Sequence, residues 1–234
     1  MSIEIPLTFL DLTQRARLEC GVSGTGPSTV VGQVGMNQLF VAWTQESWLH
    51  VQRKRQDWHF MRKSTSFVTV SGQAIYTPVE AGIPAGTFGF WNRQTLRSYN
   101  TAGGISGEIH MSYEPFDRWR DIYLFGGTRD VRTQPAVFSI NQADHGLALG
   151  PVPNSDYTVT ADYYEKPVAF VNGTDVPSIP DQYNMIIVYK TMMKYGAFDN
   201  APEVSTRGAQ EYAEVMRSLD SDRTNDWVMG GAIA

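Results

Sequence analysis

The stretch SIPDQYNMIIVYKTMMKYGAF, residues 178–198, decides how the rest of the chain must pack. Ser178 is followed by a proline and, three positions on, by an acidic residue, which is typical of a helix N-terminus. Apolar side chains then fall on every side of the predicted helix, so other elements must cover most of it. A second start signal, Asn200-Ala201-Pro202-Glu203, begins a helix with a one-sided apolar stripe that ends at Leu219. We therefore predict a helical hairpin whose inner helix is buried and whose outer helix lies over it.

Two more helices are predicted near the N-terminus. Thr8 and Asp11 have the spacing of a capping box that opens the first of them. The second covers residues 36–55 and carries an apolar stripe through Phe40 and Trp43. The glycine-rich segment between them lacks the Gly-Lys-Ser/Thr of a phosphate-binding loop, so we interpret it as a connecting loop. Cys20 lies on the apolar side of the first helix and is expected to be a small core residue.

The middle of the chain changes to a period of two, which is typical of strands. A β-hairpin is predicted from residues 67–71 and 74–78 around the turn Gly72-Gln73. Further strands are expected at 87–93, 96–99, 107–113, 136–141, 146–149 and 157–164, with a short helical turn at 115–120. The order of elements predicts an α+β fold, in which the terminal helical hairpins pack together around a β-rich, antiparallel central insertion. We place an α-helical core at 1–65 plus 177–221, a β-rich region at 66–176 and a C-terminal docking tail at 222–234.

Composition limits the functional classes. The chain has 234 residues, 42% of them hydrophobic, and a formal net charge of −5. The acidic balance gives no overall nucleic-acid-binding footprint, although a local basic patch remains open. One cysteine excludes an internal disulfide framework and fits a reducing compartment. No apolar run approaches a membrane span and no signal-peptide pattern opens the chain, so we expect a protein that stays in a cytosol or is assembled there into something larger.

The residue patterns predict no enzyme. The four histidines are scattered, and no cluster has metal-ligand spacing. No Gly-x-Ser-x-Gly nucleophile elbow occurs. We therefore expect no catalytic, cofactor-binding or metal-binding residues. A carbohydrate-binding domain is an alternative that requires Trp91, Tyr99 and Tyr113 to be exposed in one cleft; if they are buried, they belong to the core.

Two segments are candidates for binding partners. Arg53-Lys54-Arg55, followed by Arg62 and Lys63, is the strongest basic cluster in the chain. It is interpreted either as a solvated helix end or as a contact to DNA or to an acidic partner. The tail contains the apolar residues Trp227, Val228, Met229 and Ile233. An apolar tail needs a surface to cover it, so it either folds back or docks into a neighbouring subunit.

Two parts of the sequence resemble the head-to-tail adaptor proteins of tailed, especially short-tailed, bacteriophages, which are also called connector or head-completion proteins. The first is LTFLDLTQRARLECGVSGTGP at 7–27 with the helix ending VQRKRQDWHFM at 51–61. The second is the strand DYTVTADYYEKP at 156–167, which leads into PSIPDQY at 177–183. The resemblance implies a structural virion protein at the neck, between the portal protein and the nozzle or tube of the tail. Members of that family form a ring, usually a dodecamer, through which DNA passes without sequence-specific binding and without any membrane contact.

This resemblance leads to one expectation about charge. A net acidic chain suits a channel wall along which DNA slides, because basic side chains would grip phosphates. We therefore expect the Arg53-Lys54-Arg55 cluster to lie away from the channel lumen. A tail-tube or tail-completion protein is the alternative structural class and would rest on the β-rich middle.

Overall fold

The computed structural model describes residues 6–224, which form two separately packed units. Residues up to Phe60 and from Pro167 onward make a helical unit, and Met61–Lys166 make a β unit. Helices account for 41% of the structure and strands for 18%, with the helices at the two ends of the chain. The predicted α+β class, with a β-rich centre, is confirmed.

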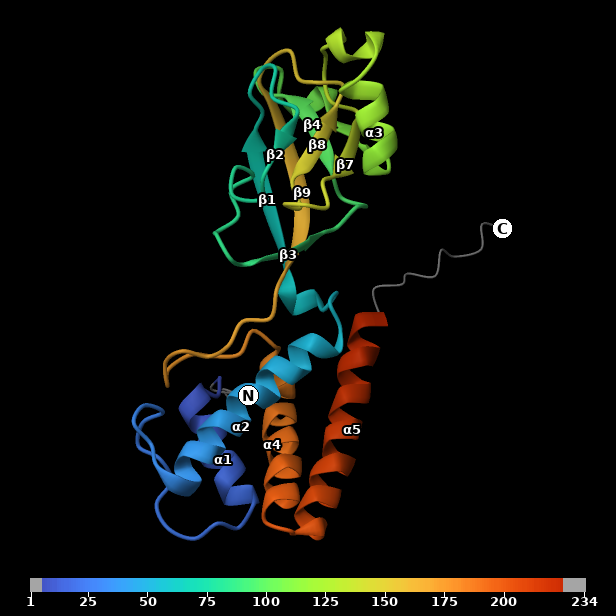
Figure 1. Ribbon diagram of the computed structural model, residues 1–234. Helices are drawn as coiled ribbons and strands as arrows, with labels where there is room; N and C mark the ends of the chain where they lie inside the picture. The colour runs from blue at the N-terminus through green and yellow to red at the C-terminus, as the bar shows by residue number, and fades with distance from the viewer. Residues whose placement is uncertain (1–5, 225–234) are drawn as a thin grey trace, which may run out of the picture. The chain divides into compact units, whose positions relative to one another are not determined.

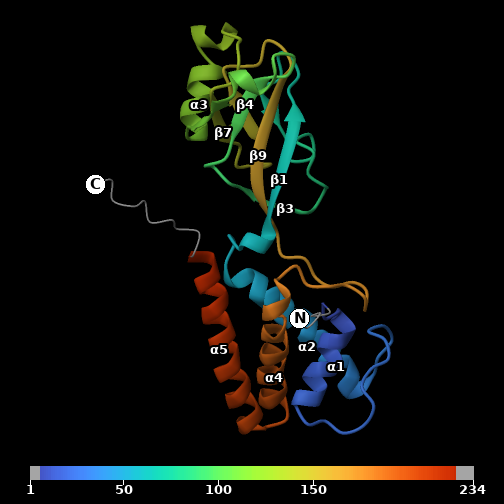
Figure 2. The same cartoon turned by 180° about the vertical axis from the view of Figure 1, so that it is seen from behind.

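The helical unit is built around one buried helix. Its four helices are α1 (Phe9–Glu19), α2 (Gly35–Lys54), α4 (Met185–Phe198) and α5 (Pro202–Thr224). α4 packs against all three others, and both ribbon views show it between α1 and α5 (Figures 1 and 2). Ile186, Ile187, Val188 and Met192 of α4 have no exposed surface. The prediction of a buried inner helix under a one-sided outer helix is therefore confirmed.

Two glycines let α4 and α5 approach closely. A Cβ added at Gly196 would lie 2.7 Å from both the Cβ and the backbone nitrogen of Ser205. A Cβ added at Gly208 would lie 2.9 Å from the carbonyl oxygen of Tyr189. Such distances are shorter than van der Waals contact, so both positions require glycine, which has no side chain.

The helix ends follow the predicted signals only in part. The capping box of α1 is confirmed: the Asp11 amide donates to Thr8 Oγ1 at 3.2 Å, and the Thr8 amide donates to Asp11 Oδ2 at 2.9 Å. Ser178, however, does not cap α4. Asp181–Tyr183 form a separate 3₁₀ turn, η4, and α4 begins only at Met185. Ile179, next to Ser178, is only 2% exposed. Burying this side chain holds the residues before α4 in a non-helical path, so the helix starts later than the cap signal predicts.

Asn200 ends one helix instead of starting the next. Its φ of 53° is left-handed, and the Ala201 amide donates to the Gly196 carbonyl at 2.9 Å. This is the hydrogen bond of a Schellman motif, in which asparagine can replace the usual glycine. α5 consequently starts at Pro202, one residue later than a cap at Asn200 would place it.

A strap that precedes α4 is fixed to α2. The Gln52 side chain donates from Nε2 to the Val168 carbonyl and accepts the Val168 amide on Oε1, both at 2.9 Å. Phe170 stacks on Phe9 at 4.7 Å and on Trp48 at 5.7 Å between ring centroids. The segment 167–176, which was predicted to belong to the β-rich region, is therefore part of the helical unit, and its Phe170 is buried in the core of that unit.

The β unit contains two sheets. The first has the order β1-β9-β4-β5 with β3 also paired to β9, and the second has the order β2-β8-β7-β6. The strands are β1 (Arg62–Val68), β2 (Ile75–Tyr76), β3 (Phe88–Trp91), β4 (Arg97–Asn100), β5 (Ile109–His110), β6 (Ser112–Tyr113), β7 (Val137–Ile140), β8 (Leu147–Gly150) and β9 (Tyr157–Glu165). All pairs are antiparallel except β6 with β7. A short helix, α3 (Phe116–Tyr123), contacts β7 and β8.

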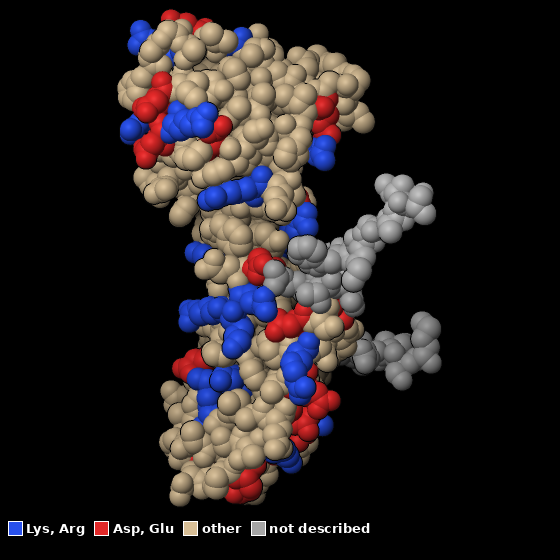
Figure 3. Space-filling model, turned by 90° about the vertical axis from the view of Figure 1, so that its right-hand side faces the viewer, with Lys and Arg blue, Asp and Glu red and all other residues tan. Residues whose placement is uncertain are grey.

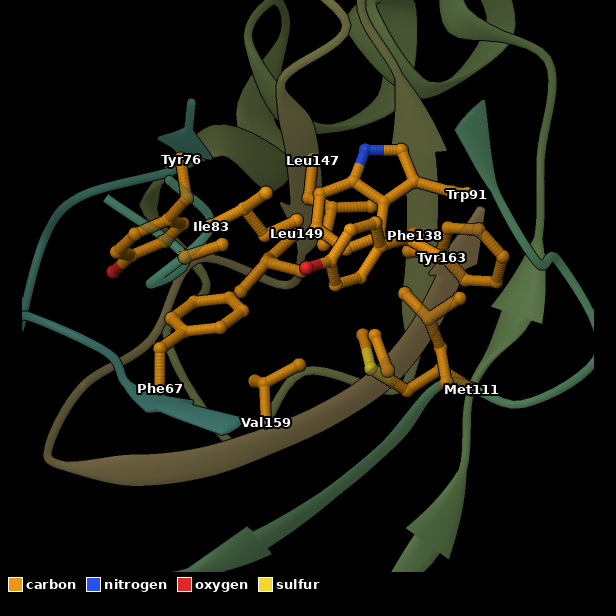
Figure 4. Close-up of a cluster of buried hydrophobic side chains, with 13 residues drawn as sticks. Phe67, Tyr76, Ile83, Trp91, Met111, Phe138, Leu147, Leu149, Val159 and Tyr163 are labelled. Carbon is orange, nitrogen blue, oxygen red and sulfur yellow. The ribbon is translucent and has the colours of Figure 1, made fainter. Parts of the chain in front are cut away.

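The alternating residues of β9 face the core of this unit. Val159 and Tyr163 join a buried cluster that includes Phe138 and Leu149 from the second sheet (Figure 4). Thr160 and Asp162 alternate with them and line an open groove on the outer side of the sheet. The strand that the period-two pattern predicts at 157–164 is therefore confirmed.

The predicted hairpin at 67–78 is wrong. β1 pairs with β9, with Phe67 opposite Val159, whereas β2 pairs with β8, with Tyr76 opposite Leu147. The two strands belong to different sheets, and the Tyr76 hydroxyl bonds the backbone of Val70 in the connection between them. The strand expected at 107–113 is likewise divided, since β5 and β6 lie in different sheets on either side of the fully buried Met111.

The close approach of α4 and α5 leads to a stability prediction. We expect Gly196→Ala to lower the free energy of unfolding by about 1–2 kcal/mol. The new methyl group meets the backbone of α5, which costs about 2–3 kcal/mol, and alanine returns about 1 kcal/mol of helix propensity. Urea unfolding followed by circular dichroism measures the loss. Gly107→Ala, where a Cβ meets nothing within 4 Å, is the matched control; equal stability of the two variants would contradict the close-packing argument.

Candidate interaction surface

The described residues contain no constellation that suggests catalysis. Within residues 6–222 no group of three or more histidine, cysteine, aspartate or glutamate side chains could hold a metal ion. Cys20 is 8% exposed, and burial raises the pKa of its thiol to about 12, so it stays protonated near neutral pH. None of the helices in the described part of the chain is long and apolar enough to cross a membrane.

The predicted basic cluster is divided by the structure. Arg53 and Lys54 are exposed in the last turn of α2. Arg55, directly after the helix, lies with its Nε 2.9 Å from Asp220 Oδ1 on α5. Arg62 belongs to the other unit, where it forms an ion pair with Asp162 of β9. Only Arg53 and Lys54 therefore remain, on the helical unit, as cations of this cluster without an ion-pair partner among residues 6–222.

α4 contributes basic residues that the sequence analysis did not connect with this cluster. Lys190 and Lys194 are one helical turn apart on the otherwise apolar α4, and both lie next to α2. Lys194 forms an ion pair with Glu46 at 2.5 Å. In the space-filling view, lysine and arginine side chains gather along the left-hand side of the helical unit (Figure 3).

Side chains from α2 and α4 meet in register along this surface. Phe198 contacts Trp43 at 5.4 Å between ring centroids, Lys194 pairs with Glu46, and Lys190 lies near His50 and Lys54. We refer to these seven residues as the α2–α4 face: Trp43, Glu46, His50, Lys54, Lys190, Lys194 and Phe198. The face is aromatic at one end and basic at the other.

The basic end carries uncompensated positive charge. The pKa of His50 is lowered, first by desolvation of the imidazole ring and then by the positive charges of Lys190, Lys54 and Lys194. Desolvation and the charges of Lys194 and Lys54 also lower the pKa of Lys190. Neither Lys54 nor Lys190 has an ion-pair partner among residues 6–222, although the Lys190 ammonium lies 5.5 Å from the centre of the Tyr212 ring. A negatively charged partner would relieve this repulsion.

The aromatic end is only partly covered. Phe198 is 57% exposed at the end of α4. Trp43 packs edge-on against Phe40 at 5.6 Å and against Tyr195 at 6.5 Å, which fixes the orientation of its ring. A large exposed ring beside a fixed tryptophan is an apolar anchor point for a partner. The sequence contained a signal for this face in the i, i+4, i+8 series Lys190, Lys194 and Phe198.

The β unit has an open polar groove of about 560 Å³ on the outer side of its first sheet. Small hydroxyl side chains such as Ser64 and Ser66 line it, and Ser64 donates to Asp162 at 2.7 Å. No aromatic side chain is among its lining residues. The groove therefore lacks the stacking surface that a sugar ring would need.

The three aromatic residues named for carbohydrate binding differ in exposure, and Tyr99 is only partly buried. Trp91 is 3% exposed and donates from its indole nitrogen to the His145 carbonyl at 2.8 Å, so it is a core residue. Tyr113 lies at the surface, where Arg93 covers its ring at 4.2 Å. The predicted tail residues Trp227, Val228, Met229 and Ile233 lie outside the described residues.

The crowding of cations predicts how His50 titrates. We expect a pKa for His50 below the ordinary value of 6.5, and Lys190→Gln should raise it because one positive neighbour is removed. Since the unfolded chain binds this proton more readily, the stability linked to neutral His50 is lost as the pH falls from 6.5 through the folded-state pKa. NMR titration of the histidine ring signals measures the shift. The control Arg15→Gln removes a cation that does not act on His50; an unchanged His50 pKa in Lys190→Gln would disprove the assigned cause.

Comparison with known proteins identifies the family. No curated protein matches the sequence. A family model described as SU10 adaptor protein matches residues 7–233, a range that takes in both the helical unit and the β unit. The match agrees with the resemblance to phage adaptors that the two ends of the sequence indicate. The chain thus belongs to the SU10 adaptor protein family, a family of bacteriophage structural adaptors.

Proposed function

We propose that the protein forms a ring, most simply a dodecamer, between the portal and the tail of a short-tailed phage. In this role it extends the DNA channel and provides the platform to which the nozzle or tube of the tail attaches. The observation that carries the proposal is the family match over residues 7–233, which includes both units. The protein would be assembled in the host cytoplasm and would remain at the neck of the virion.

The two units suit different contacts. The helical unit offers a surface with an exposed aromatic ring and unpaired cations, and both features are typical of protein interfaces. We propose that helical units pack side by side around the ring and contact the portal, and that the β units face the tail. The segment 226–234 is proposed as a docking peptide for the portal or for a neighbouring subunit.

The charge distribution bears on the position of the DNA channel. Lysine and arginine side chains that face a channel would bind phosphates and slow the passage of DNA. Arg55 is held by Asp220 on α5, whereas Arg53 and Lys54 have no ion-pair partner within residues 6–222. We therefore propose that this end of α2 faces a protein partner and that the lumen is lined by other surfaces.

A tail-completion protein is the second candidate. The two-sheet β unit favours it, because tail-tube and completion proteins are rich in strands. The helical share of 41%, more than twice the strand share, supports the adaptor.

The proposed function predicts a defined particle. When the purified chain is mixed with the portal ring of the same phage, we expect the particle mass to increase by one chain for each portal subunit, because the adaptor ring matches the portal's symmetry. Mass photometry or native mass spectrometry measures the increase. A portal ring from an unrelated phage is the control. A folded chain that leaves the portal mass unchanged, but adds mass to isolated tails, would support the tail-completion protein instead.

The proposed docking peptide can be tested by deletion. Removing residues 227–234 should weaken attachment to the portal, because the apolar side chains Trp227, Val228 and Met229 can no longer be buried in the partner. The fold should be retained, since every contact described above lies within residues 6–222. Portal binding and thermal unfolding of the truncated and full chains are compared side by side. Equal portal binding by the two chains would exclude a docking role for this segment.

A further inference from the structure

We propose that in the free chain residues 225–234 bind along the α2–α4 face of the same molecule. This inference concerns the subunit before assembly and goes beyond the ring proposed above. It assigns a covering segment to a surface that residues 6–222 leave open. Three observations support it: the order of side chains along the face, the order of residue types in the segment, and the place where α5 ends.

The α2–α4 face changes from basic to aromatic in one direction. At the end of α2, Lys54 lies near Lys190 and His50, and the two ammonium groups repel each other. One turn further along, Lys194 is neutralised by Glu46 at 2.5 Å. At the far end Phe198 and Trp43 offer apolar rings, with Phe198 57% exposed.

Residues 225–234 change from acidic to apolar in the same direction. Asn225 and Asp226 come first, and Trp227-Val228-Met229 follow at once. A carboxylate suits the Lys54 and Lys190 end, because it supplies the counter-charge that the two lysines lack within residues 6–222. At about 3.3 Å for each residue, Trp227, Val228 and Met229 would extend about 10 Å from Asp226 toward the aromatic end. Met229 and the later Ile233 are the side chains that would reach Phe198 and Trp43, where burial removes apolar surface from water on both sides of the contact.

The end of α5 brings the segment to the correct end of the face. Asp220, in the last turns of α5, forms an ion pair with Arg55, the residue that follows Lys54. Residues 225–234 therefore continue from a point beside the basic end. Extended, they can reach about 33 Å, at about 3.3 Å for each residue. The distance along α2 from Lys54 to Trp43 is about 17 Å, at 1.5 Å for each residue. The segment can thus follow the whole face without leaving its own molecule.

This contact would be reversible. Ordering the segment costs conformational entropy, which opposes the few charge pairs and ring contacts that the face offers. Binding of this kind keeps the apolar side chains of the segment away from water until a partner offers a site that binds it more tightly. Transfer of the segment to the portal or to a neighbouring subunit during assembly would be a second step, and that step rests on the proposed function. Binding of the segment within the free chain does not depend on the proposed function.

Paramagnetic NMR on the full chain tests the inference without any portal. Ala232→Cys is labelled with a nitroxide; Cys20 does not compete because it is buried and protonated. We expect severalfold weaker amide signals from the α2–α4 face than from α1, and full recovery after reduction of the nitroxide. The double variant Lys54→Gln with Lys190→Gln, and separately Phe198→Ala, should restore most of the signal. Arg15→Gln with Arg217→Gln, which removes the same net charge elsewhere on the helical unit, should leave the broadening unchanged.

Each result decides the inference. Broadening of the α2–α4 face that is lost in the two test variants and kept in the control supports it. Uniform or absent broadening overturns it. A further sample mixes chain that carries the nitroxide but no NMR isotopes with isotope-enriched chain that carries no nitroxide. In this mixture any broadening comes from a neighbouring molecule. Broadening that persists in this mixture shows that the segment binds a neighbouring copy and overturns binding within one molecule. None of these outcomes depends on whether the chain binds a portal, so they leave the proposed function to its own test.

Discussion

The structure of the helical unit depends on covering α4. This helix carries apolar side chains all round, so any side left in water would cost the free energy of exposing leucine-sized groups, about 1.5–3 kcal/mol each. α5 covers one side at the short distance that Gly196 and Gly208 permit, and α1 and α2 cover the others. The strap at 167–176, held by Gln52 and Phe170, closes the core near the start of α1. The N-terminal and C-terminal parts of the chain are therefore mutually dependent, although more than a hundred residues separate them.

The same constraint produces the α2–α4 face. A helix that is buried on almost every side can keep charged groups only where two of its neighbours leave a gap. Lys190 and Lys194 lie at such a gap beside α2, and Lys54 in the last turn of α2 comes to the same place. The result is a concentration of positive charge on a chain whose net charge is −5. Partner binding by this protein is therefore better inferred from the local arrangement of charges than from the total.

Local signals in the sequence were sufficient for some elements and insufficient for others. The Thr8–Asp11 capping box and the alternation in β9 depend only on neighbouring residues, and both were predicted correctly. The partners of β1 and β2 were not, because β9 and β8 lie far along the chain and a glycine turn does not specify which sheet the next strand joins. Asn200 was misassigned because asparagine favours both a helix N-cap and the left-handed end of the preceding helix. The candidate site was half predictable for a similar reason: Arg53 and Lys54 adjoin in sequence, whereas Lys190 comes near Lys54, Lys194 near Glu46 and Phe198 near Trp43 only after folding.

A structural adaptor has to hold other phage components, and the chain's charges and apolar groups bear on how it does so. Exposed single ion pairs contribute less than about 1 kcal/mol, so charge pairs with a partner would determine its orientation more than its affinity. Affinity must come from apolar groups, and the helical unit offers them as an exposed phenylalanine beside an oriented tryptophan. Cations adjoin these rings, so a partner that is acidic and apolar would be selected, whereas a DNA duplex could satisfy only the cations. The combination of these rings with Lys54 and Lys190, which lack an ion-pair partner within residues 6–222, therefore favours recognition of protein over recognition of nucleic acid at this surface.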